Sequence, residues 1–351
     1  MRARDLGLAC GALPPGQRNS IADVPGVTVG HATIVESEVL TGVTAVLPHD
    51  GDLFTDRPGA AAYVLNGFGK SVGLMQVNEL GCLETPILLT NTFGVGTCAN
   101  ALIRRAVRDN PEIGRQTSTV NPVVLACNDG YLSDIQAMAG TEAHAEAAIE
   151  AAGEDFETGA VGAGTGMSCF GLKGGVGSAS RRLRLDGATW HLGVLVLANF
   201  GRSGDLRLPD GCRIDPEASL GPDVRAARVQ PPSVETGSCI IVIGTDIPLE
   251  HRQLTRVAKR AGVGLAWCGS FWGNGSGDIA LAFTTANRVP AEADATFLDH
   301  RVLAEARIDR LFQAAAEATQ EAVLDALAGA ATTLGRHDHR RVGLADLLAG
   351  A

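Results

Sequence analysis

The sequence predicts a mixed α/β protein with a substantial hydrophobic core. Of its 351 residues, 45% are hydrophobic, which is enough to bury the interior of one large domain or two ordinary ones. Short runs of small and β-branched apolar residues are typical of buried strands, and residues 239–243 form the clearest of them. At 95–107 and 254–261 the apolar residues recur at helical spacing instead. The chain therefore predicts both strands and helices.

The predicted elements are separated by recognisable turn signals. Pro25-Gly26 and Asn66-Gly67 favour turns, and the first long helix ends near Asn110-Pro111. Pro248 suits the first turn of a later helix. The expected strands are residues 27–31, 41–47, 85–91, 121–127, 191–200, 239–243 and 278–285, with a further small-residue apolar run at 60–65. The expected helices are 95–109, 142–152, one that begins near Pro248 and contains 254–261, and 301–327.

Ser238, at the start of the strand 239–243, is a candidate nucleophile. It follows Gly237, and glycine tolerates backbone geometries that other residues resist, so a strained peptide bond can be held there. If the Ser238 hydroxyl attacked the Gly237 carbonyl, the chain would break and a new fragment would begin with serine. The α-amine of that serine has an ordinary pKa near physiological pH and could act as its base. The alternative is an ordinary junction between a loop and a strand.

The segment 159–180 is rich in glycine, with eight glycines in the twenty residues 159–178. It does not match a phosphate-binding loop, because Lys173 follows Leu172 instead of a glycine, and its spacing differs from the dinucleotide fingerprint. No nucleotide site is therefore expected. We expect a loop whose glycines let backbone N–H groups approach a ligand or a neighbouring strand closely.

Three polar side chains elsewhere have the chemistry of a catalytic site. Asn199 lies near the end of the strand 191–200, where its amide could stabilise an oxyanion or form a turn. Ser276 and Asp278 are two residues apart and project to the same side of an extended backbone. There they could hold an amine or a nucleophile, or cap a turn. The cluster 336–341 resembles a metal site only superficially, and we expect a solvated charged turn.

Composition restricts the partners and the compartment. The net charge of −10 gives no electrostatic reason to expect nucleic acid or an anionic membrane. The N-terminus lacks the apolar run of a signal peptide, and no stretch has the length of a transmembrane helix. The eight cysteines are scattered without a Cys-x-x-Cys pair, which suits free thiols in a reducing compartment. We therefore expect a cytoplasmic protein.

The chain resembles the self-processing serine aminopeptidases, peptidase family S58, which include L-aminopeptidase/D-amidase-esterase and the β-peptidyl aminopeptidases. The most specific combination is Lys173-Gly-Gly-Val-Gly-Ser-Ala-Ser180 together with Gly237-Ser238 before an Ile/Val strand. The matching segments are 21–31, 85–96, 162–180, 197–201, 236–248, 273–283 and 334–348. They span nearly the whole chain in the order of the family.

This resemblance implies a four-layer α/β/β/α sandwich, similar to N-terminal nucleophile hydrolases but with different chain connectivity. It implies cleavage between Gly237 and Ser238 into fragments 1–237 and 238–351, which fold together as a single domain. It also implies a homo-oligomer, commonly a tetramer of cleaved pairs, and a small peptide or amide substrate. No metal or organic cofactor, nucleic acid or membrane is expected as a partner.

The resemblance also assigns roles to the candidate residues. Ser238 corresponds to the nucleophile, and its freed α-amine to the acid and base. Asn199 corresponds to the oxyanion-stabilising asparagine, and Ser276 and Asp278 to the residues that hold the α-amine. Asn128 and Tyr131 map to a strand end that faces the substrate.

Three positions depart from the family. Asp278 stands where some members have glutamate, and the side chain shorter by one methylene changes its reach toward the α-amine. The other two bear on substrate preference more than on the chemistry. Lys70 and the pair Leu125-Ala126 stand where the family has acidic residues. A carboxylate near the pocket would help to recognise the ammonium group of a substrate.

The expected activity is hydrolysis of N-terminal residues from short peptides, amides or esters through an acyl-enzyme. Two alternatives stay open. One is an acyltransferase of the same architecture, although serine at the nucleophile position argues against the acetyl-transferring relatives. The other is an uncleaved, non-catalytic relative.

Overall fold

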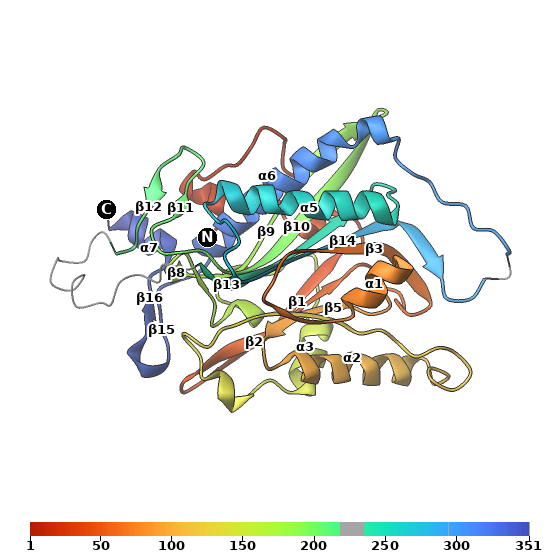
Figure 1. Ribbon diagram of the computed structural model, residues 1–351, viewed down its shortest axis with the longest axis horizontal. Coiled ribbons are helices and arrows are strands. Elements are labelled where there is room, and N and C mark those ends of the chain that lie inside the picture. Colours follow the sequence, from red (N-terminus) through yellow and green to blue (C-terminus); the bar gives the residue numbers. More distant parts are fainter. Residues whose placement is uncertain (218–234, 294, 351) are drawn as a thin grey trace.

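Two five-stranded sheets form the inner layers of the structure, a computed structural model that describes residues 1–217, 235–293 and 295–350 (Figure 1). Sheet A contains, in spatial order, β1 (Thr28–Glu36), β2 (Val39–Leu47), β5 (Ile87–Asn91), β6 (Val123–Cys127) and β4 (Lys70–Val72). Sheet B contains β3 (Asp56–Gly67), β14 (Gly275–Pro290), β13 (Thr236–Thr245), β10 (Ala188–Asn199) and β9 (Gly175–Leu185). The pairs β5–β6 and β13–β14 are parallel, and the other neighbours are antiparallel.

Helices cover the outer face of each sheet. Figure 1 shows α5 (His251–Trp267) and α6 (Asp309–Ala328) on one side, and α2 (Val95–Asp109) and α3 (Glu142–Glu150) on the opposite side. One hydrophobic cluster joins sheet B to α5 and α6, a second fills the space between the sheets, and a third joins sheet A to α2 and α3. The predicted four-layer α/β/β/α sandwich is therefore confirmed.

The remaining α-helices and strands of the described residues are short and lie between these layers or at their ends. They are α1 (Leu74–Leu80), α7 (Leu344–Ala349), and the paired strands β7 (Ser168–Cys169) with β8 (Leu172–Lys173), β11 (Leu206–Arg207) with β12 (Arg213–Ile214), and β15 (Thr333–Leu334) with β16 (Arg340–Arg341). Within the described part of the chain, none of the helices combines the length and apolar character that a membrane span requires.

From residue 239 to residue 243, strand β13 is apolar without interruption because both of its faces are covered. Cys239 and Ile241 pack toward α5 and α6, whereas Ile240 and Val242 pack between the two sheets. Alternate side chains of a strand point to opposite faces, so a strand enclosed on both sides needs apolar residues at every position. This burial fixes the register of the strand and so places Ser238 near its beginning.

Most predicted elements are present, and the differences have physical causes. β9 begins at Gly175, so the end of the predicted glycine-rich loop is a strand. A Cβ atom on Gly177 would lie 2.0 Å from the carbonyl oxygen of Ala322, so the glycine allows α6 to pack directly on β9. Helix α6 begins at Asp309 instead of residue 301, and α5 begins at His251, so Pro248 precedes the helix.

The composition of residues 201–232, rich in Pro, Gly, Asp and Arg, predicts a long exposed connector that ends at Pro231-Pro232. Residues 218–232 lie outside the described residues, so this prediction is tested only for 201–217. In the described part, β11 and β12 form a small hairpin, and Leu206 is fully buried, so this part is not simply exposed. All eight cysteines are free thiols, as predicted.

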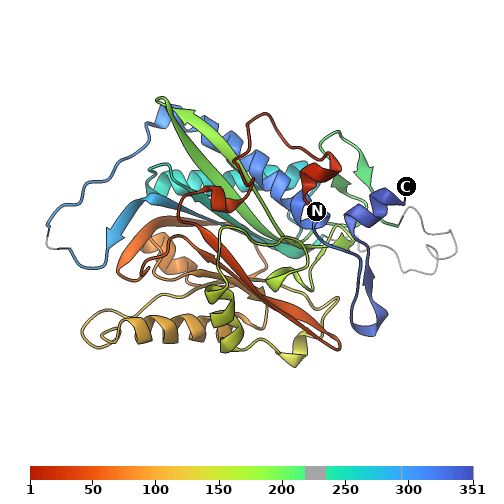
Figure 2. The ribbon, with the colours of Figure 1, turned by 180° about the vertical axis from the view of Figure 1, so that it is seen from behind.

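The N-terminal segment is attached to sheet B and α6 by buried charges. Arg181, fully buried on β9, forms ion pairs with Glu317 at 3.1 Å and Glu321 at 2.9 Å, and donates to the carbonyl of Cys10 at 2.7 Å. Arg4 forms a further ion pair with Glu321. Figure 2 shows this N-terminal segment, in red, beside α6.

We predict that Arg181→Met destabilises the fold by about 3–5 kcal/mol, because it removes the fully buried guanidinium that pairs with both Glu317 and Glu321. The midpoint of urea unfolding measures the change. The matched control is Arg184→Met on the same strand, where the side chain is exposed; we expect it to change stability by less than about 0.5 kcal/mol. Equal effects of the two variants would contradict the assignment.

Candidate active site

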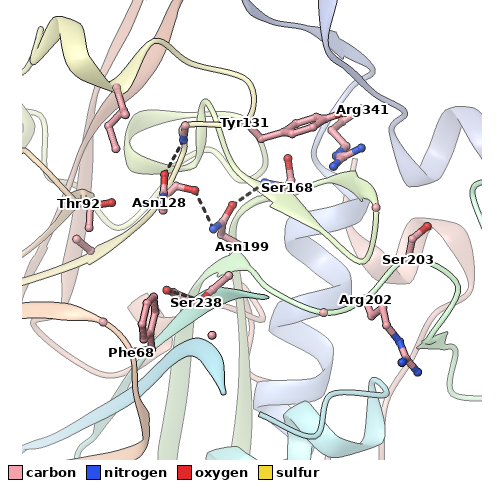
Figure 3. Close-up of a pocket in the computed structure, with 18 of the residues that line it drawn as sticks. Phe68, Thr92, Asn128, Tyr131, Ser168, Asn199, Arg202, Ser203, Ser238 and Arg341 are labelled. Atoms are coloured by element: carbon pink, nitrogen blue, oxygen red, sulfur yellow. Dashed lines mark hydrogen bonds between the residues drawn. The ribbon is translucent and has the colours of Figure 1, made fainter. Parts of the chain in front are cut away.

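A pocket of about 690 Å³ opens where β13 begins and β10 ends. Its walls come from both sheets and from the glycine-rich segment. The lining includes Phe68, Gly69, Lys70, Thr92, Ala126, Asn128, Gly130, Tyr131, Ile135, Ser168, Gly171, Asn199, Gly201, Arg202, Ser203, Glu217, Gly237, Ser238, Gly275 and Arg341. Three of the predicted site residues, Ser238, Asn199 and Asn128, thus lie in one wall, and Figure 3 shows Asn199 between the other two. Tyr131 lines the same pocket.

Ser238 is aimed at the peptide bond that precedes it. Its hydroxyl donates a hydrogen bond of 2.7 Å to the carbonyl oxygen of Gly237. Gly237 has φ of 118°, and a Cβ atom there would lie 2.1 Å from the carbonyl oxygen of Asn199. Only glycine meets both conditions without strain, because other residues rarely adopt positive φ. The glycine therefore lets β13 approach β10 closely at the point where Ser238 faces the pocket.

The Asn199 side chain is held from two sides. Its Oδ1 accepts from the backbone N–H of Ser168 at 2.9 Å, and its Nδ2 donates to the carbonyl oxygen of Asn128 at 3.0 Å. These bonds fix which end of the amide is the donor. An amide nitrogen has two hydrogens, and the contacts of the described residues use one of them, so the second is available to an oxygen in the pocket.

Lys173 holds the glycine-rich segment that supplies the Ser168 N–H. Its fully buried ammonium donates to the carbonyl oxygens of Gly164 and Met167 at 3.0 Å each, and of Gly174 at 2.7 Å. Burial lowers the pKa of Lys173 to about 7, although the charge of Asp129 opposes this shift. Three acceptors around one ammonium tie both ends of the loop together.

Asp129 is the neighbouring buried carboxyl group and directly follows Asn128. Burial raises its pKa to about 6, while the side chains of Thr41 and Asn91 and the charge of Lys173 oppose the increase. Lys173 and Asp129 therefore lie behind the wall that contains Asn128 and Asn199, and neither lines the pocket.

Ser276 and Asp278 flank the position opposite Ser238. In the parallel pairing of β13 and β14, Ser238 is opposite Gly277, which lies between them. Both side chains are fully buried, and neither lines the pocket. Alternation along β14 places them on the face that packs toward α5 and α6. The structure thus brings them next to the backbone of Ser238 and not to its hydroxyl.

The polar atoms of this pair are unsatisfied. The Ser276 hydroxyl and both carboxylate oxygens of Asp278 have no hydrogen-bond partner among the described residues. Burial raises the pKa of Asp278 to about 7, and the nearby Ser276 hydroxyl opposes the increase without reaching hydrogen-bond geometry. Buried polar atoms without partners are rare in folded proteins and point to an absent donor.

Glu235 is a buried carboxylate that the sequence analysis missed. It accepts from the Ser270 hydroxyl at 2.5 Å and from the N–H groups of Phe271 and Gly273 at 3.0 and 3.2 Å. These contacts attach the chain just before Gly237 to the turn between α5 and β14. A glutamate four residues before the predicted core strand 239–243 was the available signal, but its partners lie 35 to 38 residues away.

The open side of the pocket contains aromatic, hydroxyl and cationic groups. Tyr131 stacks on His339, and the guanidinium of Arg341 lies 3.7 Å from the Tyr131 ring centroid. The hydroxyls of Thr92, Ser168 and Ser203 have no hydrogen-bond partner in the described part of the chain. His339 does not line the pocket itself and contacts it only through Tyr131.

Fold and site together define the class of the protein. Two facing sheets between helices, with a serine at the beginning of a central strand, are features of serine peptidases with the N-terminal nucleophile hydrolase fold. The chain belongs to peptidase family S58, which it matches over residues 19–341. It is therefore a hydrolase of the aminopeptidase type.

Individual relatives agree with this assignment. The chain is 36% identical to beta-peptidyl aminopeptidase BapA of Sphingosinicella microcystinivorans, over 95% of this chain and 87% of the relative. A crystal structure of a Pyrococcus horikoshii OT3 protein matches with a TM-score of 0.90 and 44% identity, over 99% of this chain and 97% of that one. The L-aminopeptidase D-Ala-esterase/amidase of Ochrobactrum anthropi, described as a variant of the Ntn hydrolase fold, matches with a TM-score of 0.87 and 34% identity, again over 99% and 97%.

We predict that Asp278 makes stability depend on pH, and that Asp278→Asn removes this dependence. Since burial raises its folded-state pKa from 3.8 to about 7, the folded chain holds a proton between about pH 4 and 7 that the unfolded chain has released. Stability therefore falls as pH rises through this window. Relative to its parent, the variant should gain on the order of 2 kcal/mol between about pH 5 and pH 8.

The comparison is made by urea unfolding in a Ser238→Ala background, which keeps the Gly237–Ser238 bond intact. The exposed turn residue Asp186 provides the control Asp186→Asn. If Asp278→Asn and Asp186→Asn show the same pH profile, the assignment to Asp278 is wrong.

Proposed function

We propose that the chain cleaves itself between Gly237 and Ser238 and then acts as an aminopeptidase whose nucleophile is the new N-terminal serine. The observation that supports this most strongly is the 2.7 Å hydrogen bond from the Ser238 hydroxyl to the Gly237 carbonyl oxygen. A hydroxyl in that position is adjacent to the carbonyl carbon that it would attack.

The cleavage is an acyl shift followed by hydrolysis. Ser238 Oγ bonds to the Gly237 carbonyl carbon, the peptide C–N bond breaks, and the hydroxyl proton ends on the released α-amine. Water then hydrolyses the resulting ester, which gives a carboxylate on Gly237 and restores the Ser238 hydroxyl. Glu235 supports this step because its three hydrogen bonds hold the chain on the acyl side of the bond.

The freed α-amine then serves as acid and base toward a substrate. It accepts the proton of Ser238 Oγ as this oxygen attacks the substrate carbonyl, and it donates that proton to the leaving amine. The substrate acyl group stays on Ser238 as an ester until water, deprotonated by the same amine, releases it. The second hydrogen of Asn199 Nδ2 stabilises the oxyanion of each tetrahedral intermediate.

Ser276 and Asp278 are the groups proposed to hold the α-amine. An ammonium group has three donors, and the unsatisfied acceptors here are one hydroxyl and two carboxylate oxygens on either side of Gly277. In the uncleaved chain the nitrogen of Ser238 is an amide inside a strand, so this contact belongs to the cleaved state. The similarity to a beta-peptidyl aminopeptidase makes amides of N-terminal β-amino acids the first substrates to test.

We predict that wild-type protein separates into fragments 1–237 and 238–351 on denaturation, whereas Ser238→Ala stays whole and loses at least about 10³-fold of its activity, because the nucleophile is absent. Intact mass and hydrolysis of β-amino acyl p-nitroanilides measure the two effects. Ser118→Ala, at an exposed loop position, is the control and should behave as wild type. An intact wild type, or an active Ser238→Ala, would refute the proposal.

We predict that Asn199→Ala lowers kcat by about 10²- to 10³-fold, since it removes the oxyanion donor. Rates are normalised to the amount of cleaved protein determined by mass spectrometry, so that slower self-cleavage is not mistaken for slower turnover. Asn100→Ala, on the exposed face of α2, is the control. A change confined to KM would instead assign Asn199 to substrate binding.

A further inference from the structure

The charged groups of the pocket are predominantly cationic. Lys70, Arg202 and Arg341 line it, against the single carboxylate of Glu217 among the described lining residues. Arg202 forms an ion pair with Asp205 at 2.7 Å, and Arg341 lies against the Tyr131 ring. Lys70 forms no ion pair within the described residues, and its ammonium lies 4.9 Å from the ring centroid of Phe68. No carboxylate of the described residues therefore neutralises its charge.

Lys70 belongs to the segment that packs beside the nucleophile's neighbouring strand. The N–H of Phe68 donates to the carbonyl oxygen of Ser276 at 3.3 Å. A Cβ atom on Gly277 would lie 2.6 Å from Cα of Gly69, so this backbone directly contacts the residue opposite Ser238. β4, which begins at Lys70, then pairs with β6. Lys70 is thus held at a fixed point of the pocket wall, two strands from the serine.

The buried carboxylates do not offset the positive charge that the pocket presents to a substrate. Asp129 and Asp278 are fully buried and do not line the pocket, and Glu235 is occupied by three hydrogen bonds. A substrate with a free amine and no other charge enters with a net charge of +1 and meets like charges. A substrate that also has a carboxylate enters as a zwitterion and can pair with the lysine.

We propose that Lys70 makes this pocket selective for substrates that carry a carboxylate in addition to the N-terminal ammonium group. The inference rests on the proposed aminopeptidase function. The carboxylate can come from the acyl residue, as in a β-linked aspartyl residue whose α-carboxylate is free, or from the C-terminus of the leaving peptide. Both sources present the same chemistry to the lysine.

The acyl source is tested with two p-nitroanilides of equal skeleton. In the β-aspartyl compound a carboxylate occupies the position of the methyl group in the 3-aminobutyryl compound. The measured quantity is the ratio of their kcat/KM values. We expect the wild-type ratio to exceed 1, and Lys70→Met to lower it about two- to fivefold, which is the effect of one partly screened charge pair.

The source on the leaving group is tested with 3-aminobutyryl dipeptides that end in a free carboxylate or in a carboxamide. If the dipeptides show a carboxylate preference and the p-nitroanilides do not, the carboxylate that Lys70 recognises belongs to the leaving group. This result still supports the role of Lys70, provided that Lys70→Met abolishes the preference. Added salt should reduce either preference, because the lysine is exposed.

Three further variants separate charge from structure. Lys70→Arg should keep the preference, and Lys70→Glu should reverse it. Lys259→Met, at an exposed lysine that also lies over an aromatic ring but on α5, should keep the wild-type ratio. The inference is overturned if both substrate pairs are hydrolysed without a carboxylate preference, or if Lys70→Met and Lys259→Met give equal ratios. Failure of the wild type to hydrolyse any of these compounds would overturn the proposed function itself, and this inference with it.

Discussion

The site depends on the close approach of two backbones at Gly237. The carbonyl oxygen of Asn199 occupies the space where any other residue at 237 would place its Cβ atom, and the backbone there has positive φ. Because β13 is buried on both faces, the strand cannot move away to relieve this contact. The peptide before Ser238 is therefore held in one geometry, with its carbonyl oxygen on the serine hydroxyl. The burial of β13 therefore also positions Ser238.

The second requirement is that the two sheets meet at the pocket. Asn128 follows the last strand residue of β6 in sheet A, and Asn199 ends β10 in sheet B, so their hydrogen bond bridges the layers. The thiol of Cys127 also crosses between them and donates to the Ser238 carbonyl oxygen at 3.3 Å. Lys173 adds the third side by fixing the loop that orients the Asn199 amide. A displacement of either sheet would therefore move the Asn199 amide and the Ser238 hydroxyl relative to the pocket.

Local sequence patterns predicted the strands and helices because burial on one or two faces determines the spacing of apolar residues along the chain. They also singled out Ser238 and Asn199, since both polar residues lie next to apolar strands, where polar side chains are unusual. The same patterns could not find Glu235 or the role of Lys173, because their partners are backbone groups and a hydroxyl that only the folded chain brings near. The predicted start of α6, residue 301, was wrong because the charged and small residues before Asp309 have the same composition as the helix itself. Composition does not define the residue at which helical hydrogen bonding begins.

The charged groups of the site lie in two regions that differ in their exposure to water. Behind the pocket wall, Asp129 and Asp278 are shielded from water, and their raised pKa values show that ionisation there is opposed by burial. Such groups respond strongly to one added donor, because an ammonium group supplies both charge and hydrogen bonds in a low dielectric. On the open side, Lys70 remains hydrated and acts through longer-range, salt-sensitive attraction. The proposed Ser238 α-amine would lie in the buried region, next to Asp278. Selection among substrates would depend on the exposed charge of Lys70. A change at Lys70 would then alter which substrate reacts without altering how Ser238 reacts.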